Sequence, residues 1–508
     1  MEFELLTEFL DKAVCDVPDK IGFVDETGQM SYKQMQDMAY KVAHSILNLV
    51  SNKKGNIAIL MPSGINEVAC IHGVVYSQNA FSCIDDKMPT ERVLKIIDML
   101  NPVILITDEN TKEKAKNLGI SCPLLIYENC YDAEATWVQA SDAKSDDVAG
   151  IIFTSGSTGK PKGVIHSHKS LISVALSYRD DIGVKEDDRM GIQSPLYYGL
   201  GIHNTFIALS AKVCSYYIPK IFFSQPIELV KYLINNKISL VYWSTNAAMI
   251  ASRFSIWEGF EDELSKTLRV FSFAGDIAST KLVNKMRTAL PSVKYYQGYG
   301  ETEYFYNFYF PIDGNINDDA IIPIGFPGKY VTAYILTDNE KLYEISSCDQ
   351  NKQCIEGQLC IEGSGLSLGY LLDEEGSAAK YRKHPLKEDA RLFYTGDMVE
   401  LNENNEVIFK TRKDFMVKMM GHRIELGEIE ITACSLDDTM QCACVFDKSK
   451  DKIIMAYVGK FTEKELKKML KEKLPAHMIP REIIRFDQLP LNPNNKIDRI
   501  KLKEICIK

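Results

Sequence analysis

The chain has 508 residues, of which 45% are hydrophobic and 25% are charged. A chain of this length can bury more than one hydrophobic core, so about two to four domains or subdomains are expected. The formal net charge of −10 argues against a nucleic-acid partner, because no overall basic field is available to neutralise phosphates. No stretch approaches the roughly 18 uninterrupted apolar residues of a membrane span. A membrane-spanning segment is therefore not expected.

The 13 cysteines are scattered without the paired spacing of a metal site. Cys442 and Cys444 are separated by one residue, which fits neither a redox Cys-x-x-Cys motif nor a zinc knuckle. The N-terminal residues lack the pattern of a secretory signal peptide. We therefore expect reduced structural thiols and a cytoplasmic location.

Helical and strand patterns alternate in the first part of the chain. Residues 32–50 have helical apolar spacing, 56–61 are typical of a buried strand, 64–75 suggest a following helix, and 102–107 repeat the strand pattern. Such alternation favours a mostly parallel sheet covered by helices. The predicted fold class is therefore α/β.

The next strong signal, at residues 151–163, is an apolar run followed by small, hydroxylated and glycine residues and two lysines. Glycine lets the backbone approach a polyphosphate, and successive N–H groups can form an anion-binding nest. The side chains that can donate to phosphate are Ser155, Ser157, Thr158, Lys160 and Lys162. A P-loop is excluded, because the chain has Thr154 and Pro161 where that motif needs glycine and serine or threonine. A flexible surface loop is the alternative interpretation.

Residues 154–163 resemble the phosphate loop of the adenylate-forming superfamily, which includes acyl- and aryl-CoA synthetases, luciferases and peptide-synthetase adenylation domains. Five further segments resemble the superfamily's motifs in the same order: Tyr299–Glu303, Tyr394–Asp397, Arg412–Asp414, Gly421–Glu428 and Asn495–Arg499. The resemblance covers essentially the whole chain and is specific for the reaction rather than the substrate. It implies a large N-terminal domain of helix-covered sheets over residues 1–412 and a small mobile α/β domain over 413–508.

The same resemblance implies that ATP and Mg²⁺ activate a carboxylic acid as an acyl-adenylate, with release of pyrophosphate. Glu303 is expected to bind Mg²⁺, Tyr299 to stack on adenine, and Asp397 to accept the ribose hydroxyls with help from Arg412. Taken alone, Asp397 fits a turn residue, Tyr299 a core aromatic and Glu303 a solvated carboxylate. The implied ATP-binding set is Thr154, Ser155, Gly156, Ser157, Thr158, Gly159, Lys160, Lys162, Gly275, Tyr299, Asp397 and Arg412.

The implied catalytic residues are Lys496, Glu303 and Thr302. The Lys496 ammonium is expected to offset the repulsion between the carboxylate and the α-phosphate, although a lone lysine in a polar turn is ordinarily solvated. Asp414 is the expected hinge, because the resemblance implies rotation of the small domain after adenylation. A charged turn without motion is the alternative for Asp414.

The substrate is predicted from Pro195–Gly201, which resembles the corresponding segment of benzoate-type CoA ligases. Tyr198 stands where amino-acid-activating domains usually place an aspartate, so an α-amino acid would bury an unpaired ammonium. An aromatic acid is therefore expected. The predicted pocket consists of Tyr198, Gly199, His203, Trp243, Phe273, Gly298, Tyr304 and Tyr306. Each aromatic fits a core position equally well, and a packed neutral histidine is the alternative for His203.

The segment Gly421–Glu430 resembles peptide-synthetase adenylation domains, which load phosphopantetheine on a carrier protein. No serine-bearing carrier motif is found in the chain, so a phosphopantetheinyl carrier protein in trans is the expected acceptor. CoA is the alternative, which would make the protein an aryl- or short-chain acyl-CoA ligase. A hypothesis of another class is a non-catalytic nucleotide-binding homologue. A pure interaction scaffold would not need this set of residues.

Overall fold

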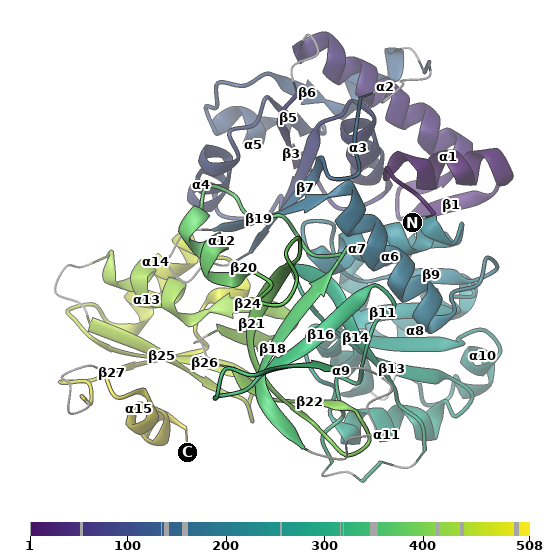
Figure 1. The fold of residues 1–508 in the computed structure, drawn as a ribbon. Helices are drawn as coiled ribbons and strands as arrows, with labels where there is room; N and C mark the ends of the chain where they lie inside the picture. Colours follow the sequence, from purple (N-terminus) through teal and green to yellow (C-terminus); the bar gives the residue numbers. More distant parts are fainter. Residues whose placement is uncertain are drawn as a thin grey trace. The chain divides into compact units, whose positions relative to one another are not determined.

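The computed structural model describes residues 2–50, 54–133, 135–136, 142–154, 161–253, 257–314, 316–317, 320–345, 354–412, 416–436, 441–491 and 497–507. The chain divides into two compact units (Figure 1). The first comprises Met1–Asp86, Leu100–Ile152 and Gly163–Lys413, and the second comprises Lys87–Met99, Phe153–Lys162 and Asp414–Lys508.

The first unit contains a nine-stranded sheet whose central strands are parallel and whose end strands are antiparallel. In spatial order its strands are β15 (Phe326–Pro327), β14 (Tyr304–Pro311), β13 (Lys294–Glu301), β12 (Val270–Ala274), β11 (Leu240–Ser244), β9 (Arg189–Ile192), β10 (Cys214–Tyr217), β1 (Ile21–Asp25) and β2 (Gly28–Ser31).

A seven-stranded sheet has a parallel arrangement over most of its width and ends in the antiparallel pair β19 and β8. Its strands in order are β19 (Gly369–Tyr370), β8 (Lys162–Ser167), β7 (Val148–Thr154), β4 (Ala80–Ile84), β3 (Asn56–Leu60), β5 (Ile104–Thr107) and β6 (Leu124–Ile126). The strands predicted over 56–61 and 102–107 are confirmed as β3 and β5.

Helices connect the strands of these two sheets, which confirms the predicted α/β fold. The predicted helices over 32–50 and 64–75 are confirmed as α2 and α3. The helices of the first unit are α1 (Thr7–Asp16), α2 (Tyr32–Val50), α3 (Ile65–Tyr76), α5 (Lys112–Asn117), α6 (His168–Ile182), α7 (Gly199–Ser210), α8 (Pro226–Asn235), α9 (Thr245–Arg253), α10 (Glu261–Ser265), α11 (Thr280–Ala289) and α12 (Glu374–Lys380), with 3-10 turns η1 (Tyr127–Asp132) and η2 (Lys220–Ser224).

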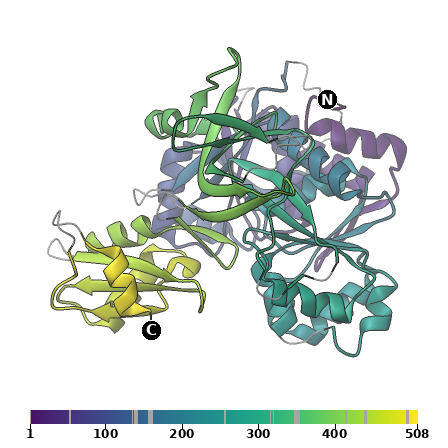
Figure 2. The ribbon, with the colours of Figure 1, turned by 60° about the horizontal axis from the view of Figure 1, so that its bottom comes forward.

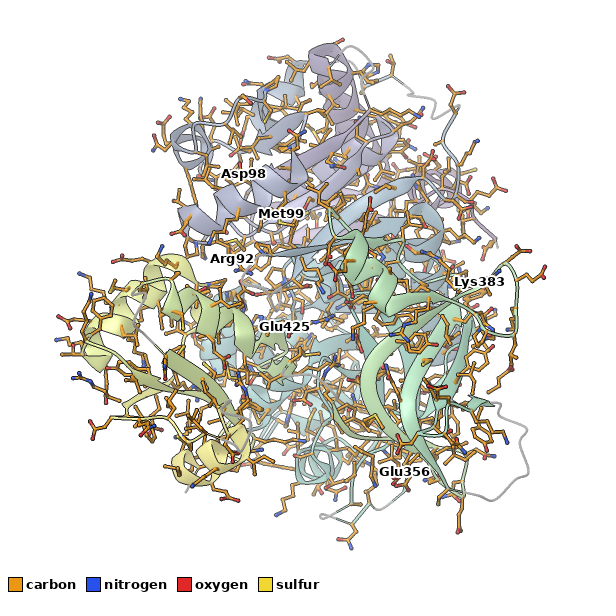
Figure 3. All side chains as sticks on the ribbon, turned by 60° about the vertical axis from the view of Figure 1, so that its left-hand side comes forward. Arg92, Asp98, Met99, Glu356, Lys383 and Glu425 are labelled. Carbon is orange, nitrogen blue, oxygen red and sulfur yellow. The ribbon has the colours of Figure 1, made fainter. Side chains whose placement is uncertain are left out.

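A six-stranded antiparallel sheet completes the first unit. Figure 3 shows Glu356 and Lys383 on this sheet, and both side chains are exposed. Its strands are β17 (Leu342–Ile345), β16 (Val331–Leu336), β18 (Ile355–Gly363), β21 (Arg391–Leu401), β20 (Tyr381–Lys383) and β22 (Val407–Arg412), which pairs with β21.

The second unit contains a β-hairpin and a three-stranded sheet, seen from another side in Figure 2. A buried ion pair between Arg92 on α4 and Glu428 on α13 joins two of its helices. Its elements are α4 (Thr90–Leu100), β23 (Met416–Met419), β24 (His422–Glu425), α13 (Leu426–Cys434), β25 (Gln441–Asp447), β26 (Lys452–Val458), α14 (Glu463–Lys473), η3 (Ala476–Met478), β27 (Glu482–Arg485) and α15 (Arg499–Cys506).

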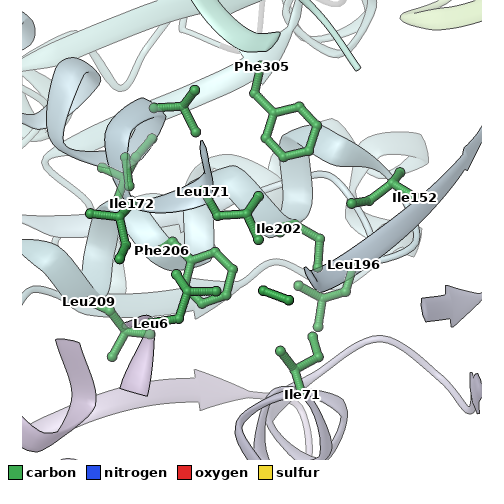
Figure 4. Packing of buried hydrophobic residues seen from close by; sticks show 14 of the residues in the cluster. Leu6, Ile71, Ile152, Leu171, Ile172, Leu196, Ile202, Phe206, Leu209 and Phe305 are labelled. Carbon is green, nitrogen blue, oxygen red and sulfur yellow. The ribbon is translucent and has the colours of Figure 1, made fainter. Parts of the chain in front are cut away.

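The nine-stranded sheet separates two hydrophobic cores of the first unit. On one face, side chains of α6 and α7 pack against Tyr242 and Phe305, and Figure 4 shows Phe305 directed toward Leu171 and Ile202. On the other face, α8, α9 and α11 pack against Trp243. Neighbouring residues of a strand point to opposite faces, so Tyr242 and Trp243 necessarily belong to different cores.

Candidate active site

The turn that carries Thr302 and Glu303 joins strands β13 and β14, and it is anchored on its backbone. His166 Nε2–H donates to the Thr302 carbonyl over 2.9 Å, and the Ser367 N–H donates to the Glu303 carbonyl over 3.0 Å. Burial lowers the pKa of His166 to about 4, so the imidazole stays neutral near pH 7. These two hydrogen bonds therefore fix the backbone of the turn that carries the Glu303 carboxylate.

The Glu303 side chain is fully buried. The Tyr370 hydroxyl donates to its Oε1 over 2.7 Å. Tyr370 lies on β19, far from Glu303 along the chain, so motif spacing could not associate the two residues. Sequence reasoning missed Tyr370 and also missed His166, although His166 lies just after the phosphate-loop segment.

Tyr299, Asp397 and Arg412 form a second buried cluster. The Tyr299 hydroxyl donates to Asp397 Oδ2, and the Arg412 guanidinium donates to Asp397 Oδ1. Asp397 and Arg412 are direct partners across β21 and β22, and Arg412 also lies 3.6 Å from Glu301 Oε1. Burial, with the charge of Asp397 next, raises the pKa of Tyr299 well above its usual value. The structure thus brings together three residues of the predicted ATP site.

The phosphate-loop residues Ser155–Lys160 lie outside the described residues, as do Asp414 and Lys496. At the ends of the loop, the Thr154 hydroxyl donates to the Lys162 carbonyl over 3.5 Å. Gly275 directly follows β12 with φ of 83°, a backbone conformation that favours glycine. The roles of these residues remain predictions.

His203 lies among aromatic rings on the α6 and α7 side of the sheet. Its Nε2–H donates to the Val174 carbonyl over 3.0 Å. Burial lowers its pKa to about 4, so the ring is neutral and Nδ1 carries a lone pair. Nδ1 is buried and has no hydrogen-bond partner among the described residues. The ring centroids of Tyr178, Tyr242, Phe305 and Tyr306 lie 6.0, 6.0, 6.0 and 6.1 Å from that of His203.

Two glycines of the predicted pocket pack beneath these rings. A Cβ at Gly298 would lie 2.6 Å from the Tyr242 hydroxyl oxygen, and one at Gly199 would lie 2.6 Å from Phe305 Cε1. Both positions therefore need the smallest residue. Tyr178, Tyr242 and Phe305 are cluster members that sequence reasoning missed, because only their packing places them around His203.

Two of the predicted pocket residues lie on the other face of the sheet. Trp243 and Phe273 belong to the core on the opposite face of the sheet, and Trp243 Nε1–H donates to the Gly191 carbonyl over 2.9 Å. The cause is strand alternation, which directs Tyr242 rather than Trp243 toward His203. The Tyr304 hydroxyl donates to the Tyr330 carbonyl, and Tyr198 packs against the ring of Tyr197. Trp243 and Phe273 therefore do not face the histidine, while a pocket role for Tyr198 and Tyr304 stays a prediction.

Comparison with known proteins identifies the family. A model described as AMP-binding enzyme matches residues 10–371, and one described as AMP-binding enzyme C-terminal domain matches residues 428–496. The chain belongs to the AMP-binding enzyme family. It is an adenylate-forming ligase homologous to peptide-synthetase adenylation domains. The predicted arrangement of a large N-terminal and a small C-terminal domain is confirmed, and the boundary after residue 412 stays a prediction.

Among its relatives, tyrocidine synthase 1 from Brevibacillus parabrevis is 28% identical over 494 residues, which is 96% of this chain and 44% of that protein. The chain thus spans less than half of that relative. The Vibrio cholerae adenylation domain AlmE, solved with glycyl-adenosine-5'-phosphate, has a TM-score of 0.83 at 19% identity, covering 98% of this chain and 97% of AlmE.

A double mutant of o-succinylbenzoate CoA synthetase from Bacillus subtilis has a TM-score of 0.81 at 18% identity, covering 98% of each chain. At such identity these two structures are similar in fold alone. The adenylation fold therefore occurs both with an aminoacyl-adenylate and in a CoA synthetase. No helix in the described part of this chain is long and apolar enough to cross a membrane.

Proposed function

We propose that this AMP-binding enzyme uses ATP and Mg²⁺ to convert a hydroxylated aromatic acid into its acyl-adenylate, releasing pyrophosphate. The acyl group then passes to the phosphopantetheine thiol of a separate carrier protein. The observation that carries the proposal is the buried cluster of Tyr299, Asp397 and Arg412, because three strands converge there to present one carboxylate.

Asp397 has the chemistry of a ribose acceptor. A carboxylate accepts hydrogen bonds from two neighbouring hydroxyls, and charged hydrogen bonds are stronger than neutral ones. Arg412 and Tyr299 hold this carboxylate in one orientation. When ATP binds, the ribose hydroxyls would replace some of the hydrogen bonds that Tyr299 and Arg412 donate to Asp397.

Glu303 has the chemistry of a magnesium ligand. Mg²⁺ is commonly held by one or two carboxylates together with substrate phosphates, and the anchored turn presents one such carboxylate. When bound, the ion would neutralise phosphate charge. The turn and its carboxylate would be held in place by the chain's own hydrogen bonds.

The substrate preference follows from His203. Its neutral Nδ1 can accept one hydrogen bond, and a buried acceptor without a partner costs free energy. A phenolic hydroxyl on the acid would satisfy it, and the surrounding rings would favour an aromatic body. An ammonium group would gain a hydrogen bond there without neutralisation of its charge, which disfavours an α-amino acid.

The carrier protein as acceptor is supported by the resemblance of the segment Gly421–Glu430 to peptide-synthetase adenylation domains. CoA is the second candidate, because the CoA synthetase shares the fold. Incubation with ATP, the preferred acid and either CoA or a phosphopantetheinylated carrier distinguishes them. Rapid acyl-CoA formation without loading of the carrier would favour the CoA ligase.

Pyrophosphate exchange into ATP tests the adenylation step across benzoate, hydroxybenzoates, butyrate, alanine and phenylalanine. We expect a hydroxybenzoate to give the highest rate. Asp397→Asn should reduce the rate by about 10- to 100-fold, as expected for a lost charged hydrogen bond. Glu400→Gln is the control, because Glu400 lies on the same strand in a surface ion pair with Lys410. Absence of exchange with every acid would favour the non-catalytic homologue.

A further inference from the structure

Strand β19 consists of Gly369 and Tyr370 and pairs antiparallel with β8, the strand that follows the phosphate loop. The flanking backbone extends this attachment: Leu368 N–H donates to the Ile165 carbonyl over 2.7 Å, and Leu371 N–H donates to the Gly163 carbonyl over 2.8 Å. Tyr370 is therefore fixed by its backbone to the start of β8.

The Tyr370 side chain reaches the Glu303 carboxylate. Both side chains are buried, with Glu303 at 0% and Tyr370 at 4% exposure. The hydroxyl to Oε1 distance of 2.7 Å is typical of a good O–H···O hydrogen bond. Because a carboxylate oxygen has more than one lone pair, this bond leaves Oε1 able to bind a cation.

Tyr370 is held both at its backbone and at its ring. Its backbone N–H donates to the Ser377 hydroxyl over 2.9 Å. Its ring packs edge to face against Tyr381 with centroids 5.4 Å apart, and the Tyr381 hydroxyl pairs with the Ser367 hydroxyl over 2.6 Å. Ser367 also donates its N–H to the Glu303 carbonyl. The donor to Glu303 is thus part of a connected, buried network.

We propose that Tyr370 is a positioning residue for Glu303. Its hydroxyl fixes the rotation of the carboxylate, and β19 ties that orientation to the strand leaving the phosphate loop. The Glu303 carboxylate and the start of β8 are then held in place relative to each other before a nucleotide and a divalent cation bind. This inference rests on the proposed role of Glu303 as a magnesium ligand.

Tyr370→Phe tests the inference, because it removes the hydroxyl while the backbone pairing of β19 remains. Mn²⁺ replaces Mg²⁺, and its binding to the protein with a non-hydrolysable ATP analogue is followed by the loss of the free-ion electron paramagnetic resonance signal. We expect affinity for Mn²⁺ to fall by about 10-fold or more, as is typical when a hydrogen-bond partner of a ligand is removed. The analogue's affinity in the presence of EDTA should stay unchanged.

Tyr381→Phe is the matched control, since it also removes one buried tyrosine hydroxyl from the network but not the one bonded to the carboxylate. It should keep wild-type affinity for Mn²⁺. Equal effects in the two variants, or an equal loss of nucleotide affinity in EDTA, would show a structural role for Tyr370 and overturn the inference.

Glu303→Gln distinguishes a failure of this inference from a failure of the proposed function on which it rests. If Glu303→Gln leaves Mn²⁺ affinity unchanged, the metal role of Glu303 is wrong. If Glu303→Gln weakens Mn²⁺ binding while Tyr370→Phe behaves as wild type, the metal role stands and the positioning role is wrong.

Discussion

At the scale of single residues, the proposed substrate preference depends on His203 Nδ1, which is buried and has no hydrogen-bond partner among the described residues. His203→Phe keeps an aromatic ring but removes the acceptor. We expect the ratio of kcat/KM for a hydroxybenzoate over benzoate to fall about 10-fold, because the wild-type acceptor stays unpaired when the hydroxyl is missing. His44→Phe, a replacement on helix α2, is the control. An unchanged ratio in His203→Phe would remove the histidine from substrate recognition.

Glu67 on α3 gives a residue-scale prediction about stability. It is fully buried, and burial raises its pKa to about 8 from an ordinary value of 4.5. Between these values the unfolded chain releases a proton that the folded chain keeps, so stability falls as pH rises through this window. The loss is about 1.4 kcal/mol per pH unit where the two states differ by a full proton.

Glu67→Gln cannot ionise, so its stability should not fall in this way. Thermal unfolding of both proteins at pH 5 and pH 8 measures the effect. We expect the Tm of the variant minus that of the wild type to increase from pH 5 to pH 8. A difference that is the same at both pH values would show that Glu67 does not stay protonated in the folded protein.

At the scale of elements, α14 shows how a sequence signal fixes a helix end. The Thr462 hydroxyl accepts from Glu465 N–H, and Glu465 Oε2 accepts from Thr462 N–H. Thr462→Ala should destabilise the helix by about 1 kcal/mol and speed amide hydrogen exchange within α14 about fivefold. Thr462→Ser should exchange as the wild type does. Amide hydrogen exchange at the wild-type rate in Thr462→Ala would mean that the cap does not stabilise α14.

Elements with strong local patterns were predictable. Helix α14 spans Glu463–Lys473, between the capping residue Thr462 and Pro475, because capping and proline act locally. The side of the sheet that a residue faces was not predictable in this way. The residue type and position of Trp243 predict a pocket residue, yet Tyr242 is the neighbour that faces His203. A shift of one residue along a strand changes the face.

At the scale of the whole molecule, the ordered motifs were enough to predict the family and the α/β fold, both now confirmed. They also named Asp397 and Arg412, which the structure places in contact. Tyr370 could not be found, because its contact with Glu303 depends on the pairing of β19 with β8. Such long-range pairing is a property of the sheet topology and leaves no local periodic signal.

Attack of a carboxylate oxygen on the α-phosphate of ATP can be followed with an isotopic label. The acid that gives the fastest exchange is labelled with ¹⁸O in its carboxylate and incubated with ATP, Mg²⁺ and hydroxylamine, which captures the acyl group. We expect AMP that carries one ¹⁸O atom from the acid, formed together with pyrophosphate and the hydroxamate. Unlabelled AMP, or ADP and phosphate in place of AMP and pyrophosphate, would contradict it.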